Sequence, residues 1–263
     1  MTKQMAGKAE YTEKERMAGK MKSSERKQGL VTDKFTVGYG KKVILSNVNL
    51  MAEPGRVLTL IGPNGSGKST ILKSIVKQLK SLGGVVYLNG KATSEMKEAE
   101  IAKSLSMVMT EHIHPELMSC RDVVATGRYP YTGRLGILDK QDWKLVDEAI
   151  TMVHAEEVAE QSFTRISDGQ RQRVMLARAI CQDTAILVLD EPTSYLDIRY
   201  KLDILNSIRK LARERNIAVI MSLHELDLVQ KVSDMVACVD GTTVSHIGPP
   251  EEIFQGSLVQ KLY

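Results

Sequence analysis

Residues 62–70 form a glycine-rich run whose side chains and backbone suit the binding of phosphate. In order they are Gly62, Pro63, Asn64, Gly65, Ser66, Gly67, Lys68, Ser69 and Thr70, which fits the pattern GxxxxGK[ST]. Residues 57–61 form a largely apolar run, and apolar residues recur at helical spacing over 68–79, which predicts strand, loop and helix. Glycines let successive N–H groups surround an anion where such a helix begins. We expect Lys68 to reach the β- and γ-phosphates of a nucleotide and Ser69 to ligate Mg²⁺.

Two adjacent carboxylates follow a second apolar run. Residues 185–189 are all apolar, and Asp190 and Glu191 come next. A buried parallel strand opens at its carboxyl end onto the ligand crevice of an α/β sheet. We therefore expect Asp190 to hold Mg²⁺ through its water shell. Glu191, on the opposite side of the strand, would deprotonate the attacking water. An ordinary solvated strand end is the alternative, and the phosphate loop upstream favours the catalytic interpretation.

A third segment, residues 166–173, offers another site for an anion. It reads Ile-Ser-Asp-Gly-Gln-Arg-Gln-Arg and precedes a helical run over 174–180. The Ser167 hydroxyl and the Gly169 N–H would lie at a helix N-terminus, where unpaired donors and the helix dipole favour phosphate. An ordinary helix cap formed by Ser167 is the alternative. The segment resembles the signature motif of ATP-binding cassette (ABC) ATPases, usually spelled LSGGQ, with Ile166 and Asp168 as mild departures.

The order of the remaining motifs extends this resemblance over about residues 30–260. Tyr39 corresponds to the aromatic residue that stacks on adenine in the family. Residues 194–197 resemble the D-loop, which links the two ATP sites of a dimer, and His224 matches the switch histidine that would hydrogen-bond the γ-phosphate. The resemblance implies Glu191, His224 and Lys68 as catalytic residues. It adds Tyr39, Ser167, Gly169, Gln170 and Asp197 to the nucleotide-binding set.

One position departs from the family pattern. The family has a glutamine after the strand expected here at 107–109, where it contacts Mg²⁺ and the attacking water, whereas this chain has Thr110 and Glu111. Either side chain could offer an oxygen to the metal. The residues alone do not choose between the two.

The distribution of apolar runs predicts an α/β fold. Runs over 57–61, 107–109, 185–189 and 217–223 each join helical sequence, as in a largely parallel sheet. Residues 83–90 and 235–248 predict antiparallel pairs around the turn dipeptides Asn89-Gly90 and Asp240-Gly241, so the sheet should be mixed. Helical signals dominate from residue 113 to about 165. The resemblance implies a P-loop NTPase (RecA-like) core with an antiparallel β subdomain, and a helical signature subdomain inserted over about 113–175, all within an ATP-binding domain of residues 29–263.

The formal net charge of +4 belongs to the first 28 residues, which contain eight bases and four acids. This tail has few apolar residues and no sustained period, which predicts disorder. A basic arm for anionic lipid or nucleic acid and a dispensable extension both remain open. The chain also has three widely spaced cysteines without a CxxC pair, which favours a reducing compartment. No window approaches the roughly 20 apolar residues that span a bilayer, so we expect a cytoplasmic protein.

Residues 127–136 resemble a stretch in the ATPases of importers for iron-siderophore, haem and cobalamin complexes. The resemblance implies an ATPase that uses ATP and Mg²⁺ to energise a binding-protein-dependent importer of such a chelate. Its expected partners are a second copy of the chain, which sandwiches ATP, permease subunits on separate chains at the cytoplasmic face of the membrane, and, indirectly, a periplasmic or lipoprotein substrate-binding protein. The alternative is a non-transport ABC ATPase acting on nucleic acid or the ribosome. Such proteins usually carry two cassettes or a long coiled coil, whereas this chain has a single phosphate loop and no sustained heptads, so no nucleic acid is expected as a partner.

Overall fold

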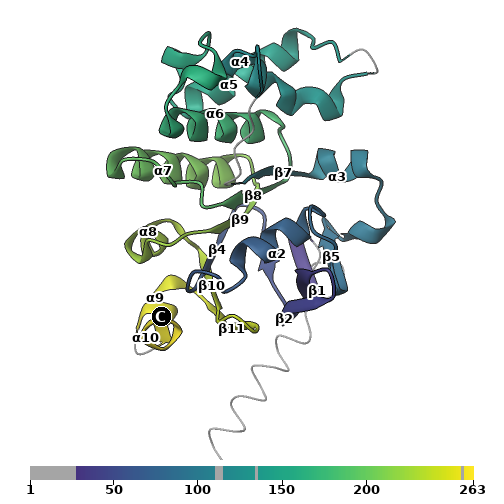
Figure 1. Cartoon of the computed structure of the whole chain (residues 1–263), viewed down its shortest axis with the longest axis vertical. Helices are drawn as coiled ribbons and strands as arrows, with labels where there is room; N and C mark the ends of the chain where they lie inside the picture. Colours follow the sequence, from purple (N-terminus) through teal and green to yellow (C-terminus); the bar gives the residue numbers. More distant parts are fainter. Residues whose placement is uncertain (1–27, 110–114, 134–135, 256–257) are drawn as a thin grey trace, which may run out of the picture.

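The computed structural model describes residues 28–109, 115–133, 136–255 and 258–263 (Figure 1). The strands are β1 (Leu30–Tyr39), β2 (Lys42–Val48), β3 (Met51–Ala52), β4 (Val57–Ile61), β5 (Gly83–Leu88), β6 (Lys91–Ala92), β7 (Leu105–Val108), β8 (Ile186–Asp190), β9 (Ala218–Ser222), β10 (Met235–Val239) and β11 (Val244–Gly248). The α-helices are α2 (Lys68–Ile75), α3 (Glu98–Ser104), α4 (Cys120–Ala125), α5 (Lys140–Met152), α6 (Asp168–Cys181), α7 (Ile198–Glu214), α8 (Leu226–Val232), α9 (Pro250–Phe254) and α10 (Leu258–Leu262). Short 3₁₀ turns are η2 (Thr93–Glu95), η3 (Thr126–Tyr131), η4 (Glu156–Val158) and η5 (Phe163–Arg165).

The larger sheet has the strand order β11-β10-β4-β9-β8-β7. All neighbours in it are parallel except β10 and β11, which confirms the expected mixed sheet. Because β4, β9 and β8 are parallel neighbours, their carboxyl ends meet at one edge. The phosphate loop follows β4, Asp190 ends β8, and His224 comes two residues after β9. The topology therefore collects at one edge three motifs that are far apart in sequence.

The central strands are buried on both faces, as their continuous apolar sequences predict. Successive side chains alternate between two apolar cores. On β8, Leu187 and Leu189 pack into the core shared with α6, α7 and α8, whereas Ile186 and Val188 pack into the core shared with α2. Helices thus cover both faces, and α2 also contacts β1 of the second sheet.

The smaller sheet is antiparallel, with the order β2-β1-β5-β6 and β3 paired to β1. The predicted turn at Asn89-Gly90 joins β5 to β6, with Leu88 opposite Lys91. The second predicted pair, around Asp240-Gly241, joins β10 to β11. Both expected antiparallel pairs are confirmed. Each is part of one of the two sheets, because β5 also pairs with β1 in the smaller sheet and β10 also pairs with β4 in the larger sheet.

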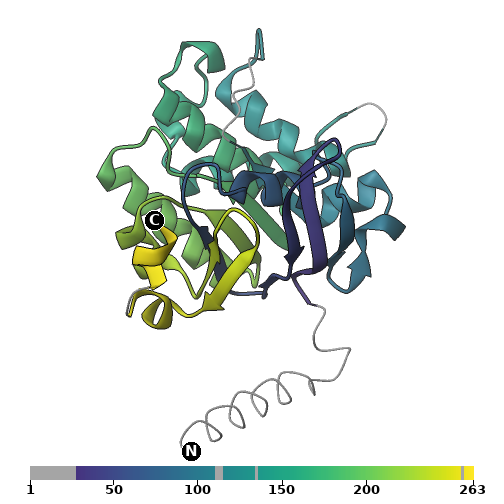
Figure 2. The ribbon, with the colours of Figure 1, turned by 60° about the horizontal axis from the view of Figure 1, so that its bottom comes forward.

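Helices α4, α5 and α6 pack against one another at one end of the molecule, beyond α7 and the edge of the larger sheet (Figure 1). Their shared core includes Val124, Ala149, Phe163 and Val174, all nearly fully buried. Seen from a second side, α9 and α10 lie beside β10 and β11 (Figure 2). Residues 1–27 lie outside the described part of the chain, so the basic tail over 1–28 and the domain boundaries stay predictions.

Two elements differ from their expected bounds. The helix expected over 68–79 ends at Ile75, because Lys77 has a φ of 62° and the following turn closes on the last helical turn through Gln78 N–H to Lys73 O. The strand expected at 107–109 is β7, which starts at Leu105 because its register against β8 begins opposite Ile186. Turn geometry thus sets the end of α2 and strand pairing sets the start of β7, whereas apolar spacing had placed each boundary a few residues away.

Within the described residues, no helix has the length and apolar character needed to cross a bilayer.

Cys120, Cys181 and Cys238 are all buried and free. Burial raises their pKa values to about 11, about 12 and about 11, so little thiolate is present at neutral pH. We expect all three thiols to react slowly with a disulfide reagent such as DTNB in the native protein and rapidly in guanidinium chloride. Absorbance of the released thiol measures both rates, and fast labelling of any thiol in the native protein would contradict this packing.

Candidate nucleotide site

At two positions of the phosphate loop, the backbone conformation and the close neighbours admit only glycine. Gly62 and Gly67 have φ values of 149° and 99°, in the region that side chains disfavour. A Cβ on Gly62 would lie 2.1 Å from the Val239 carbonyl oxygen, and one on Gly67 would lie 2.5 Å from Leu45 Cδ1. The loop is therefore held close to β10 and β2, and α2 begins directly after it at Lys68.

Lys68 folds back over the loop. Its Nζ donates to the carbonyl oxygens of Gly62 at 2.7 Å and Pro63 at 3.0 Å. Burial lowers the pKa of Lys68, and the nearby Glu191 and Asp190 carboxylates oppose that shift. A buried ammonium with two neutral acceptors suits an incoming anion, because a phosphate would give it a full opposite charge.

Asp190 is fully buried at the end of β8 and is tied to two neighbouring elements. Its Oδ1 accepts hydrogen bonds from Ser69 Oγ at 3.0 Å and from Ser222 Oγ at 2.7 Å. Its Oδ2 is buried without a hydrogen-bond partner among the described residues. An unpaired buried carboxylate oxygen beside a serine hydroxyl is a set of hard donors that fits Mg²⁺, as the sequence predicted for Ser69 and Asp190.

Glu191 leaves the strand and meets His224. It has a φ of 50°, its N–H donates to Ser222 Oγ at 3.0 Å, and its Oε2 accepts from Ser194 Oγ at 3.2 Å. Its Oε1 contacts His224 Nε2. Alternation along a strand predicts that the Glu191 side chain points to the side opposite Asp190. That expectation does not apply, because β8 ends at Asp190 and the left-handed turn after it sets the direction of Glu191.

A cavity of about 290 Å³ brings nine of the predicted site residues together. Tyr39 lies at its rim, 52% exposed, with its hydroxyl 3.4 Å from Thr70 Oγ1. An exposed ring beside the phosphate loop is placed to stack on a flat base. The cavity is lined by Tyr39, Ile44, Asn64, Gly65, Gly67, Lys68, Ser69, Thr70, Glu191 and His224.

The signature residues line a different cavity, of about 490 Å³, which shares no lining residue with the first. Its walls are Ser167, Asp168, Gly169, Gln170, Arg173, Tyr195, Leu196, Asp197 and Tyr200. Ser167 also caps α6, since its Oγ accepts from Gln170 N–H and its own N–H donates to Gln170 Oε1 at 2.9 Å. One chain therefore does not bring Ser167, Gly169, Gln170 or Asp197 to its own phosphate loop.

Sequence reasoning missed three residues that touch this site. Ser222 bridges Asp190 and the Glu191 backbone, Ile44 lines the cavity from β2, and the Tyr263 hydroxyl accepts a hydrogen bond from Gly62 N–H at 3.1 Å. A polar residue inside the apolar run 217–223, just before His224, was a signal for Ser222. Ile44 and Tyr263 gave none, because only the fold brings them near the loop. Thr110 and Glu111 lie outside the described residues, so their assignment as metal ligands stays a prediction.

A mixed α/β sheet with a phosphate loop after one strand and an Asp-Glu pair at the end of another defines a P-loop NTPase. Residues 45–194 match the family model described as ABC transporter. The chain belongs to the ABC transporter family and is its ATP-binding, ATP-hydrolysing component.

Relatives extend the match over most of the chain. An uncharacterized ABC transporter ATP-binding protein of Methanocaldococcus jannaschii, MJ0873, is 42% identical over 234 residues, which are 89% of this chain and 81% of that protein. The iron(3+)-hydroxamate import ATP-binding protein FhuC of Bacillus subtilis is 35% identical over 235 residues, which are 89% of this chain and 87% of that protein. The fold matches the dimeric ATP-binding cassette MJ0796 bound to ADP and Pi, with a TM-score of 0.74, 24% identity and coverage of 84% and 98%.

Replacing Lys68 tests its contact with phosphate. We expect Lys68→Ala to weaken ATP binding at least about tenfold, because a hydrogen bond to a charged group contributes about 1.5–3 kcal/mol. Isothermal titration calorimetry measures the affinity, and Lys80→Ala, at an exposed position beyond α2, is the matched control. Equal affinities for the two variants would show that the ammonium does not bind the nucleotide.

Proposed function

We propose that this chain energises the import of an iron-siderophore, haem or cobalamin-type chelate by hydrolysing ATP. The observation that carries the hydrolytic part is the convergence of Lys68, Asp190, Glu191 and His224 at the carboxyl ends of adjacent parallel strands. The transport class is supported by FhuC, named for iron(3+)-hydroxamate import, and by the stretch over 127–136. These relatives favour import over the alternative of an ATPase acting on nucleic acid.

The proposed reaction is attack of water on the γ-phosphorus of ATP. The phosphates lie in the loop with Lys68 neutralising part of their charge, and Tyr39 stacks on adenine. Glu191 Oε1 accepts the proton of the attacking water, the bond between the γ-phosphorus and the β,γ-bridging oxygen breaks, and ADP and phosphate leave. His224, already beside Glu191, donates a hydrogen bond to the γ-phosphate.

Ser69 and Asp190 would hold Mg²⁺ in this site. The buried, unpaired Oδ2 of Asp190 and the neighbouring Ser69 hydroxyl support that assignment. When bound, the metal neutralises charge that develops on the phosphate oxygens. The chain's own contribution is to fix the two ligands from β8 and α2, because Ser222 holds Asp190 from a third element.

Two copies of the chain complete each ATP site in this proposal. Ser167, Gly169, Gln170 and Asp197 line a cavity separate from the phosphate loop of their own chain. They would therefore act on ATP held by the loop of a second copy, with the helix N-terminus at Ser167 facing the γ-phosphate. The γ-phosphate then contacts both copies and favours the closed dimer, and hydrolysis removes that contact.

Closing and opening of this dimer would move permease subunits, which are on separate chains and which the ATPase would contact at the cytoplasmic face of the membrane. A substrate-binding protein would deliver the chelate to the permease and meet the ATPase only indirectly. The relatives' names as import and transport ATP-binding proteins support this placement.

Replacing the proposed base separates binding from turnover. We expect Glu191→Gln to keep ATP affinity, to lower the rate of phosphate release by about 10²–10⁴-fold, and to accumulate an ATP-bound dimer. Light scattering after size exclusion measures the dimer, and Glu214→Gln, on the exposed end of α7, is the control. A turnover rate near that of the wild type would assign the proton transfer to another group.

Uptake in cells tests the transport class. We expect a strain without this ATPase to lose uptake of one radiolabelled chelate among ferric siderophores, haem and cobalamin, and to regain it with the wild-type chain but not with Glu191→Gln. Undiminished uptake of all three chelates would contradict the proposed cargo while leaving the ATPase activity in place.

A further inference from the structure

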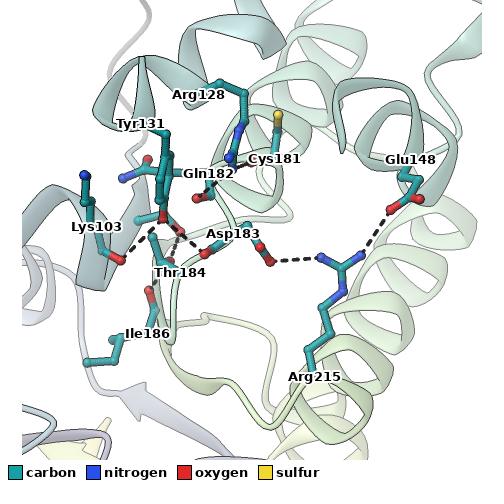
Figure 3. Close-up of polar contacts among 11 residues, drawn as sticks. Lys103, Arg128, Tyr131, Glu148, Cys181, Gln182, Asp183, Thr184, Ile186 and Arg215 are labelled. Carbon is teal, nitrogen blue, oxygen red and sulfur yellow. Dashed lines mark hydrogen bonds and ion pairs between the residues drawn. The ribbon is translucent and has the colours of Figure 1, made fainter. Parts of the chain in front are cut away.

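Residues 127–136 supported a transport class by resemblance alone. In the structure, the first half of this stretch lies in η3 and makes specific contacts. Arg128 lies in η3, at the junction between the packed helices α4, α5 and α6 and the larger sheet, and is 7% exposed (Figure 3). A guanidinium cannot lose its charge in a protein, so burying it requires partners. Those partners show which elements the residue joins.

Arg128 holds the C-terminal end of α6. One of its terminal nitrogens donates to the carbonyl oxygens of Cys181 at 3.0 Å and Gln182 at 3.4 Å (Figure 3). Its Nε donates to Asp142 Oδ1 of α5 at 2.8 Å. The last carbonyls of a helix lack partners within the helix, and a cation there also stabilises the helix dipole. Through these two sets of contacts, Arg128 joins α5 to the end of α6.

The residues on either side of Arg128 tighten this contact. A Cβ on Gly127 would lie 2.4 Å from the Arg178 carbonyl oxygen, so η3 presses directly on the last turn of α6. Arg178 Nε in turn donates to Thr126 Oγ1 at 2.8 Å. The Tyr131 ring lies under the Arg128 guanidinium, which is 4.1 Å from the ring centroid. The segment is therefore built around the end of α6.

The same segment also contacts the turn that leads into β8. The Tyr131 hydroxyl lies 3.3 Å from the Asp183 carbonyl oxygen, just before β8, and 3.5 Å from that of Lys103 in α3 (Figure 3). Arg215, after α7, bridges the Asp183 carboxylate at 3.2 Å and Glu148 of α5 at 3.6 Å. The turn between α6 and β8 is thus contacted from both sides.

The end of α6 matters because of what lies at its other end. The helix has 14 residues, about 21 Å, and begins at the signature residues after Ser167. Through the turn at Asp183 the chain continues into β8, which ends at Asp190 and leads to Glu191. Arg128 therefore contacts the start of the turn that joins the signature helix to β8, the strand that leads to Glu191.

We propose that Arg128 is a positioning residue, which fixes the direction of α6 so that the signature residues meet the ATP held by a second copy. The inference rests on the proposed dimer. Arg128 lines neither the cavity of the phosphate loop nor that of the signature residues, and it would act through the carbonyls of Cys181 and Gln182. Lysine at this position keeps the charge but cannot serve Asp142 and the carbonyls together in the fork geometry of arginine.

The test measures ATP-driven dimerisation in the Glu191→Gln background. We expect Arg128→Lys to raise the protein concentration for half-maximal dimer about tenfold, the size of one charge-assisted hydrogen bond lost, while ATP affinity of the dilute monomer stays unchanged. The matched control is Arg121→Lys, because the Arg121 guanidinium pairs with Asp147 and lies over the Trp143 ring, both in α5. In otherwise wild-type protein, high protein concentration should restore the ATPase rate of Arg128→Lys.

The outcomes separate this inference from the proposed function. A merely stabilising role would lower the melting temperature of Arg128→Lys without moving the dimer midpoint, and equal midpoints for the Arg128 and Arg121 variants would overturn the proposal. Absence of any ATP-driven dimer in the Glu191→Gln parent would overturn the two-copy site as well. If Arg128→Lys fails to fold, Arg128→Met combined with Asp142→Leu removes both charges of the ion pair together, and the same midpoint decides.

Discussion

The buried carboxylate of Asp190 is the constraint around which the site is arranged. A charge with no exposure to water is stable only when its surroundings supply donors or a cation. Here the donors come from α2 through Ser69 and from β9 through Ser222, so one side chain ties three elements at the carboxyl edge of the sheet. One oxygen is left without a partner among the described residues, and that deficit is what makes the position suitable for a metal ion.

The rest of the site follows from keeping this edge intact. Ser222 turns the same hydroxyl toward the Glu191 N–H, which holds the residue after Asp190 in a left-handed turn and directs its carboxylate to His224. The phosphate loop approaches from β4 and needs glycine at residues 62 and 67 because β10 and β2 lie so near. Parallel neighbours in the sheet make these approaches possible, since motifs after β4, β8 and β9 emerge side by side.

Short sequence patterns predicted the features that depend on neighbouring residues. Each of these features has a sequence signal tied to a backbone requirement, and the fold contains all of them: the phosphate loop, the Asp-Glu pair, the Ser167 cap and both antiparallel pairs. The end of the helix at Ile75 escaped prediction because Lys77 adopts a left-handed turn that apolar spacing does not encode. Ile44, Tyr263 and the contacts of Arg128 escaped for a different reason. Each depends on contacts between separate elements that only the tertiary fold brings close.

The way Lys68 lies against its own loop has a consequence for how the site would select its ligand. The ammonium donates to the carbonyl oxygens of Gly62 and Pro63, which belong to the same loop, so Lys68 helps to hold the shape of the loop that it serves. In the proposed role, a phosphate competes with these two neutral carbonyls for the ammonium, and what it offers in addition is a full negative charge. Such a site selects its ligand by charge, because the loop itself already supplies neutral acceptors.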